Sequence, residues 1–90
     1  MNVFRIYLKA VWSGGLYIVA SPNRETAKQL VEKHFFAEHD EYDWIADAME
    51  EEPDRTRWSF LSTTLQVKKL SRLVCSYKEP TVIEYMFYTQ

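Results

Sequence analysis

Residues 4–12 show a strict two-residue alternation, and this pattern constrains the fold more than any other feature of the sequence. The charged side chains of Arg5 and Lys9 occupy odd-numbered positions, and the even-numbered positions are all apolar: Phe4, Ile6, Leu8, Ala10 and Trp12. Successive side chains of an extended strand point to opposite faces, so this period predicts a strand over residues 2–12 with one buried face.

A turn is predicted directly after this strand, at Ser13-Gly14-Gly15. Glycine accepts the positive φ that tight hairpin turns require, so residues 16–20 are expected to return antiparallel to the first strand. In this hairpin we expect Tyr17 and Val19 on the same face as Arg5.

Helical spacing replaces the alternation in the middle of the chain. Asn23 follows Pro22 as a candidate N-cap, and a helix is predicted over residues 24–37. Its apolar residues lie three and four apart and are expected to cover the apolar face of the first strand: Ala27, Leu30, Val31 and Phe35. A second, short helix is predicted over residues 41–51, and Pro53 ends it. The apolar residues with helical spacing in this segment are Trp44, Ile45, Ala48 and Met49.

The last third of the chain returns to strand patterns. Residues 55–61 have no clear period and are expected to form a loop that Trp58 and Phe60 anchor against the core. Alternation and β-branched residues then predict two further strands. The predicted elements are a strand over residues 63–70, a bulge at Lys69-Leu70 with a continuation over residues 73–77, a turn at residues 78–80, and a final strand over residues 81–88.

These elements predict an α+β domain in the order strand, strand, helix, helix, strand, strand. Ninety residues supply one hydrophobic core, so residues 1–90 are expected to form a single compact domain. With a hairpin at each end and the helices between them, we expect a mainly antiparallel four-stranded sheet with the helices packed on one face. The opposite face is then free to bind a partner.

Composition excludes several functional classes. Gly14 and Gly15 are the only glycines, so the chain has no second glycine-rich loop that could bind a nucleotide phosphate. Cys75 is the only cysteine and cannot form an internal disulfide, which favours a reducing compartment. No window approaches the roughly 18 apolar residues that a membrane span requires. A cytoplasmic protein is therefore expected.

No catalytic or metal-binding constellation stands out in the sequence. His34 and His39 are five residues apart, whereas ligands on one helical face are three or four apart, and no cysteine pair or calcium loop supplies further ligands. Cys75 on a predicted strand is expected to be a buried apolar residue rather than a nucleophile. One helix layer also leaves little room for a catalytic pocket. We therefore expect no metal, no cofactor, no small-molecule substrate and no enzymatic activity.

The uncovered face of the sheet is the leading candidate for binding. Its expected members are Arg5, Tyr7, Lys9, Tyr17, Lys68 and Tyr88, with Tyr85 as the alternative to Tyr88. Aromatic residues make up 16% of the chain, more than one small core needs, so a second copy is expected to bury the tyrosines inside a rim of cations. The alternative partner is single-stranded nucleic acid, whose phosphates need cations and whose bases stack on aromatic rings.

The segment from Glu38 to Asp54 has the strongest charge asymmetry. It holds nine carboxylates and no Lys or Arg, so its charge is −9 while the rest of the chain carries +7. A solvated helical surface is the simplest interpretation. The alternatives are a docking surface for a basic partner, or an imitation of DNA phosphates by an accessory protein of a phage or mobile element. The residues expected to carry either role are Asp43, Asp47, Glu50 and Glu51. Among all these functions we expect a non-catalytic protein-interaction module that associates with itself.

Overall fold

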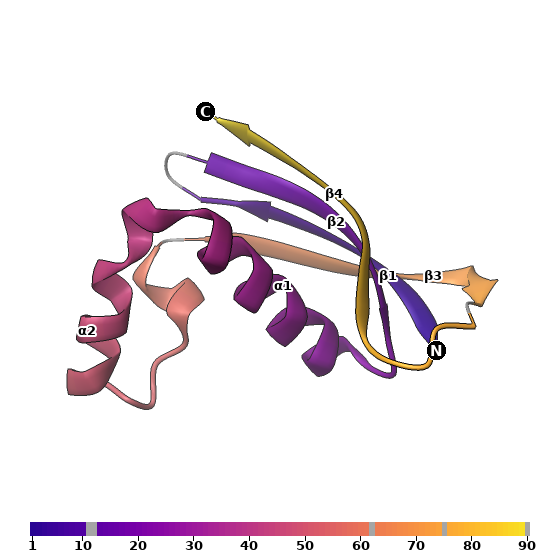
Figure 1. Ribbon diagram of the computed structural model, residues 1–90, viewed down its shortest axis with the longest axis horizontal. Coiled ribbons are helices and arrows are strands. Elements are labelled where there is room, and N and C mark those ends of the chain that lie inside the picture. The colour runs from indigo at the N-terminus through magenta and orange to yellow at the C-terminus, as the bar shows by residue number, and fades with distance from the viewer. Residues whose placement is uncertain (11–12, 62, 75, 90) are drawn as a thin grey trace.

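The fold is a single antiparallel sheet of four strands with the longer α-helix against one face, and the shorter α-helix lies beyond one end of the sheet (Figure 1). The computed structural model describes residues 1–10, 13–61, 63–74 and 76–89. Its elements are β1 (Asn2–Lys9), β2 (Ser13–Ser21), α1 (Arg24–Glu38), the 3-10 turn η1 (Asp40–Tyr42), α2 (Trp44–Glu51), the 3-10 turn η2 (Arg57–Phe60), β3 (Thr64–Val74) and β4 (Thr81–Thr89). The expected α+β class, element order, antiparallel sheet and one-sided helix layer are confirmed.

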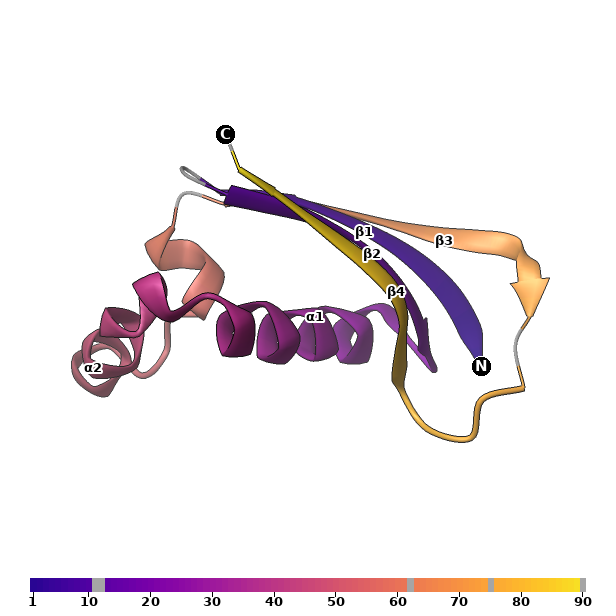
Figure 2. The same ribbon diagram turned by 45° about the horizontal axis from the view of Figure 1, so that its top comes forward.

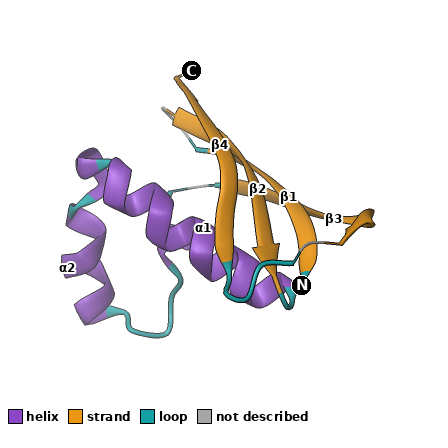
Figure 3. Cartoon of the chain, turned by 45° about the vertical axis from the view of Figure 1, so that its right-hand side comes forward, coloured by secondary structure: helices purple, strands orange, loops and turns teal. Residues whose placement is uncertain are grey.

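The order of the strands in the sheet is β3-β1-β2-β4, with the first hairpin in the centre. The hairpin expected between the last two strands is wrong, because β3 pairs with β1 and β4 pairs with β2. After the first hairpin forms, each of its strands still has one free edge. The two later strands each take one of these edges, and the chain passes from one edge to the other at the end where β1 begins (Figure 3).

The turn of the first hairpin does not lie at the glycines, so that prediction is wrong. The Ala10 N–H donates to the Ser13 carbonyl at 2.8 Å, and Gly14 is already paired with Lys9 in the sheet. A Cβ on Gly14 would lie 2.7 Å from Tyr88 Cε2 and 2.8 Å from the carbonyl oxygen of Leu8. Glycine is therefore needed for close packing, not for a turn. Val11 and Trp12 lie outside the described residues.

This register places Tyr17 and Val19 in the core, and their predicted position on the uncovered face is wrong. Tyr17 lies opposite Ile6, Val19 lies opposite Phe4, and both side chains are fully buried. A shift of one residue moves every side chain of a strand to the other face. Because the turn comes earlier than predicted, the register of β2 differs from the predicted one by an odd number of residues, which has the same effect.

Helix α1 begins where the sequence predicts and ends one residue later. Asn23 is its N-cap, and the Asn23 side-chain oxygen accepts from the Thr26 N–H at 2.8 Å. The predicted stripe faces the sheet, and Phe36 joins it because its ring packs on Trp58, 5.0 Å between centroids. The buried core is Phe4, Ile6, Leu8, Tyr17, Val19, Ala27, Val31, Phe35, Phe36, Tyr42, Ile45 and Leu61.

The later segments also follow the predicted pattern in outline. Helix α2 buries Ile45, although Trp44 with the same helical spacing is 51% exposed. Trp58 and Phe60 pack against the core from η2, as expected. The register of β3 against β1 is interrupted between Lys69 and Val74, close to the predicted bulge.

The alternation of the last strand offers two sets of side chains for the buried face, Ile83-Tyr85-Phe87 and Val82-Met86-Tyr88, and the strand buries neither set whole. The register of β4 against β2 shifts at Ile83. The helix-covered face therefore receives Val82 from one set and Tyr85 and Phe87 from the other. A bulge changes which residues point inward, and this one divides the strand into two short regular pieces.

Candidate functional site

The open face of the sheet, meaning the face opposite the helices, is the candidate functional site. Figure 2 shows α1, α2 and η2 on the other side, and no helix of the described chain covers the open face. The register gives its principal members: Arg5, Tyr7 and Lys9 on β1, Leu16 and Ile18 on β2, Gln66 and Lys68 on β3, and Glu84, Met86 and Tyr88 on β4. The predicted residues found there are Arg5, Tyr7, Lys9, Lys68 and Tyr88, whereas Tyr17 is in the core.

Two exposed cations lie directly opposite each other on the open face. Arg5 pairs with Lys68 across β1 and β3, and neither side chain forms an ion pair within the described chain. Like charges at opposed positions destabilise a sheet. Lys9 lies four residues farther along β1, about 13 Å away at the rise of an extended strand. An anionic group of a partner would relieve this repulsion.

Tyr7 and Tyr88 form the aromatic part of the open face. Their ring centroids are 6.1 Å apart with 29° between the planes, and the Tyr88 hydroxyl donates to the Leu8 carbonyl at 3.3 Å. Burial raises the pKa of Tyr88 to about 12. A side-chain hydrogen bond with Tyr7 and the charge of Tyr7 add to this rise. Tyr88 is therefore neutral and held in place over Gly14, so it offers a preformed contact surface.

A shallow hollow of about 280 Å³ lies beside these rings. Arg5, Tyr7, Leu16 and Gln66 line it, which combines a cation, an amide, a hydroxyl and an apolar wall. Sequence reasoning missed Leu16 and Gln66. A turn between Ala10 and Ser13, in place of one at the glycines, would have placed Leu16 here.

The acidic segment forms a separate surface on η1, α2 and the residues around them. All nine of its carboxylates are exposed, and Glu52 is the one that forms an ion pair in the described chain, with Arg55 at 3.1 Å. Asp43, Asp47 and Glu51 are four residues apart, so α2 presents them on one side. The described residues contain no group of three or more His, Cys, Asp or Glu that could hold a metal ion.

His34 joins the helix layer to the sheet. The Tyr17 hydroxyl and His34 Nδ1 are 3.0 Å apart, and the His34 ring lies 4.3 Å from the ring of Tyr85. Burial raises the pKa of Tyr17 above its ordinary value, and Tyr85 and Glu38 contribute to the rise. These groups form a polar contact at the boundary of the core.

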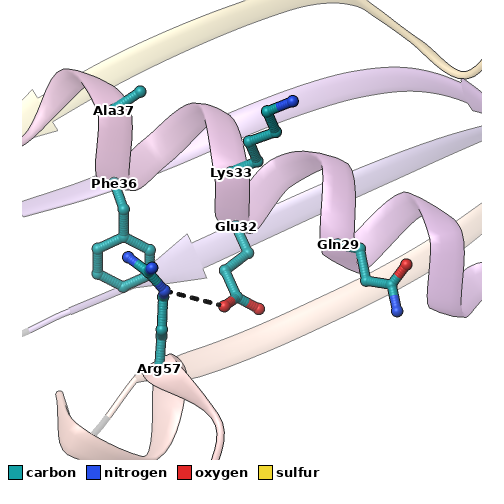
Figure 4. A pocket seen from close by; sticks show the side chains of 6 residues that line it. All are labelled: Gln29, Glu32, Lys33, Phe36, Ala37 and Arg57. Carbon is teal, nitrogen blue, oxygen red and sulfur yellow. Dashed lines mark ion pairs between the residues drawn. The ribbon is translucent and has the colours of Figure 1, made fainter. Parts of the chain in front are cut away.

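A hollow of about 450 Å³ lies between α1 and η2 (Figure 4). It is larger than expected from a single helix layer and falls within the range of ligand pockets, about 300–1,000 Å³. Arg57 Nε lies 3.6 Å from Glu32 Oε1, and the guanidinium lies over the Phe36 ring at 5.4 Å. Burial raises the pKa of Glu32, and the charge of Arg57 partly offsets this. The charged groups here hold η2 to α1.

No helix in the described part of the chain has the length and apolar character needed to cross a membrane. A comparison of the chain with protein-family models, with curated proteins and with solved structures found no match. The function must therefore be argued from the surfaces of the chain itself.

Proposed function

We propose that the protein is a non-catalytic interaction module that binds protein, including a second copy of itself, through the uncovered surface of its sheet. The observation that carries this proposal is the composition of the open face. Its centre has the aromatic ring of Tyr7 on β1 and the apolar side chain of Leu16 on β2, and the exposed Met86 lies beside Leu16 on the edge strand β4. The exposed cations Arg5 and Lys68 lie next to Tyr7. An apolar centre with a polar rim is the usual anatomy of a protein interface.

Preorganisation supports a role in binding. A side chain that is already fixed loses little conformational entropy when a partner covers it. Tyr88 is held by its hydrogen bond to Leu8 and by its contact with Tyr7, so this part of the open face needs no rearrangement. The exposed side chain of Met86 is flexible and can adapt to the contour of a partner.

The separation of charge supports oriented encounter. Cations lie on the open face, whereas the acidic segment lies on η1 and α2. Complementary charges contribute to association rate and orientation more than to affinity. We place the module in the cytoplasm, because a reducing compartment suits a chain whose only cysteine is Cys75.

Light scattering coupled to size exclusion tests the proposal on the full chain across a range of concentrations. We expect a concentration-dependent dimer, and Tyr7→Glu should weaken any contact made by the centre of the open face. Gln29→Glu adds the same charge on the exposed side of α1 and should leave the dimer unchanged. A clean monomer at high micromolar concentration would overturn self-association.

Single-stranded nucleic acid is the second candidate partner for the open face. The unpaired cations Arg5 and Lys68, opposite each other beside Tyr7, favour it. Fluorescence anisotropy with labelled oligonucleotides tests it, because log affinity should fall linearly with log salt by about 0.7 for each phosphate contact. Arg5→Ala and Lys68→Ala should each reduce that slope by about one contact. No binding at about 50 mM salt would exclude this candidate.

Acidic docking is the third candidate, favoured by the exposure of all nine carboxylates in the segment. Capture of a DNA-binding protein should then require the charges on α2 and its cap. Neutralisation of these charges tests the role, by the combined substitutions Asp43→Asn, Asp47→Asn, Glu50→Gln and Glu51→Gln. If the neutralised protein keeps every partner, the segment is a solvated surface.

A further inference from the structure

Strand β4 is an edge of the sheet with an unusual amount of exposed apolar surface. Ile83 is 39% exposed, Tyr85 is 47% exposed and Met86 is 59% exposed. These are three of the five large apolar side chains that are exposed in the described chain. An edge strand also presents a row of backbone N–H and C=O groups that no neighbouring strand satisfies, which makes it a template for another strand.

The opposite edge of the sheet differs from β4. Strand β3 exposes Lys68 and Lys69, and its register is interrupted after Lys69. Exposed lysines are a usual device that prevents an edge from pairing. The register shift does not distinguish the two edges, because β4 also has one at Ile83. The sequence of β4 contains no Lys, Arg or Pro, and Glu84 is its only charged residue. Pairing of β4 with β3 of another copy is therefore disfavoured, whereas pairing of β4 with β4 is not.

The sequence of β4 selects a register for such pairing. In a two-fold antiparallel pair, an axis through Glu84 would oppose two carboxylates, and like charges at opposed positions are destabilising. An axis through Met86 uses the regular segment beyond the bulge at Ile83. It places Met86 opposite Met86, Tyr85 opposite Phe87 and Glu84 opposite Tyr88 of the second copy.

We propose that two copies join through β4, with the two-fold axis at Met86, into one continuous eight-stranded antiparallel sheet. This inference rests on the proposed self-association and moves the contact to the border of the open face. The axis is perpendicular to the sheet, so both helix layers lie on one side and both open faces lie on the other. The two sets of Arg5, Lys9 and Lys68 then form one extended surface that stays free for a further partner.

Disulfide trapping tests the register directly. In a Cys75→Ser background, Met86→Cys places two cysteines across the axis. The Cα atoms of opposed antiparallel residues are about 4.5–5.5 Å apart, within the range that a disulfide spans. Mild oxidation should therefore give a covalent dimer. Lys68→Cys on the opposite edge is the matched control and should stay monomeric. Equal cross-linking of the two variants would overturn the proposal.

Sedimentation of Met86→Lys separates this inference from the proposed function. Two ammonium groups at the axis should weaken dimerisation at least about tenfold, because like charges repel across an interface. Circular dichroism checks that the variant is folded, which is expected because Met86 is exposed. Tyr7→Glu should keep the dimer if β4 is the interface. A dimer that resists Met86→Lys but not Tyr7→Glu contradicts the β4 register and keeps self-association, whereas a monomeric wild type contradicts both.

Discussion

Substitution of Gly14 by alanine is the sharpest test of how the first hairpin is built. The Cβ of the alanine would meet Tyr88 Cε2 at 2.7 Å and the carbonyl oxygen of Leu8 at 2.8 Å. Both distances are shorter than any ordinary contact of a methyl group. The ring of Tyr88 can move, but the Leu8 carbonyl belongs to the central strand and can move only if β1 and β2 separate locally.

The expected loss of stability follows from two opposed effects. Overpacking of a close contact costs typically 1–3 kcal/mol. Replacement of glycine in a strand restores roughly 0.5–1 kcal/mol, because it restricts the unfolded chain. The net loss for Gly14→Ala should be about 1–2 kcal/mol, which lowers Tm by roughly 5–15 °C in a domain of this size. Gly15→Ala is the matched control, since its nearest neighbours are ring atoms of Phe87 and Tyr17 at 3.3 Å that can yield slightly.

Thermal and urea denaturation followed by circular dichroism measure both variants. The order of stability should be wild type, then Gly15→Ala, then Gly14→Ala. Gly14→Asn discriminates further, because Asn-Gly is favoured in a hairpin turn but is larger than alanine in a close contact. We expect it to be less stable than Gly14→Ala. A Gly14→Asn protein as stable as the wild type would refute the assignment of Gly14 to the strand.

Substitutions of Tyr42, Glu32 and Tyr88 test three further side-chain contacts of the fold. Tyr42→Phe should cost about 1–3 kcal/mol in urea denaturation, because it leaves the buried Ser13 hydroxyl, now 2.9 Å from Tyr42, without a partner. Adding Ser13→Ala should recover most of this loss, and no recovery would contradict the pairing. Burial raises the pKa of Glu32 above the unfolded value of 4.5, because the folded protein favours the neutral carboxyl group. The stability that this preference contributes is fully present below pH 4.5 and is lost as the pH rises through the folded value. Glu32→Gln should therefore gain stability relative to wild type between pH 4 and pH 7, and a constant difference would contradict the burial. The raised pKa of Tyr88, about 12 against 10, predicts stability that is lost above pH 10, and Tyr88→Phe should flatten this alkaline decline.

Local patterns were sufficient to predict most of the individual elements. The cap at Asn23, the stripe of α1 and the alternation of β1 are short-range signals, and each element begins where these signals predict it, although β1 ends at Lys9 and not at residue 12. The order of the strands was not predictable in the same way. Both β3-β4 pairing and the observed pairing satisfy the alternation of β3 and β4, and the choice depends on which edges of the central hairpin are free.

The sequence predicted the open-face residues of β1 correctly, but it did not predict those of β2, because their positions depend on the register of the first hairpin. Arg5, Tyr7 and Lys9 lie on the first strand, whose two faces its own alternation determines, and their placement is confirmed. Tyr17 depended on the position of the turn, and Gly14 gave a misleading signal there. The sequence Gly-Gly occurs both in tight turns and in strands where an aromatic ring packs against the backbone. Only the contact of Gly14 with Tyr88 in the structure distinguishes these two cases.

The register of β2 determines the character of both faces of the sheet. It brings the Tyr17 hydroxyl into the core, where it requires a partner, and His34 on α1 supplies that partner at 3.0 Å. The same register brings Leu16 and Ile18 to the open face. Compared with the predicted face, which held Tyr17 and Val19, the observed face therefore has one fewer ring on which a base would stack. It has one more aliphatic side chain that a protein surface would bury. Burial of aliphatic side chains favours association with proteins, whereas recognition of single strands depends on stacking rings. The register of the first hairpin therefore supports the proposal of a protein partner over that of a nucleic acid.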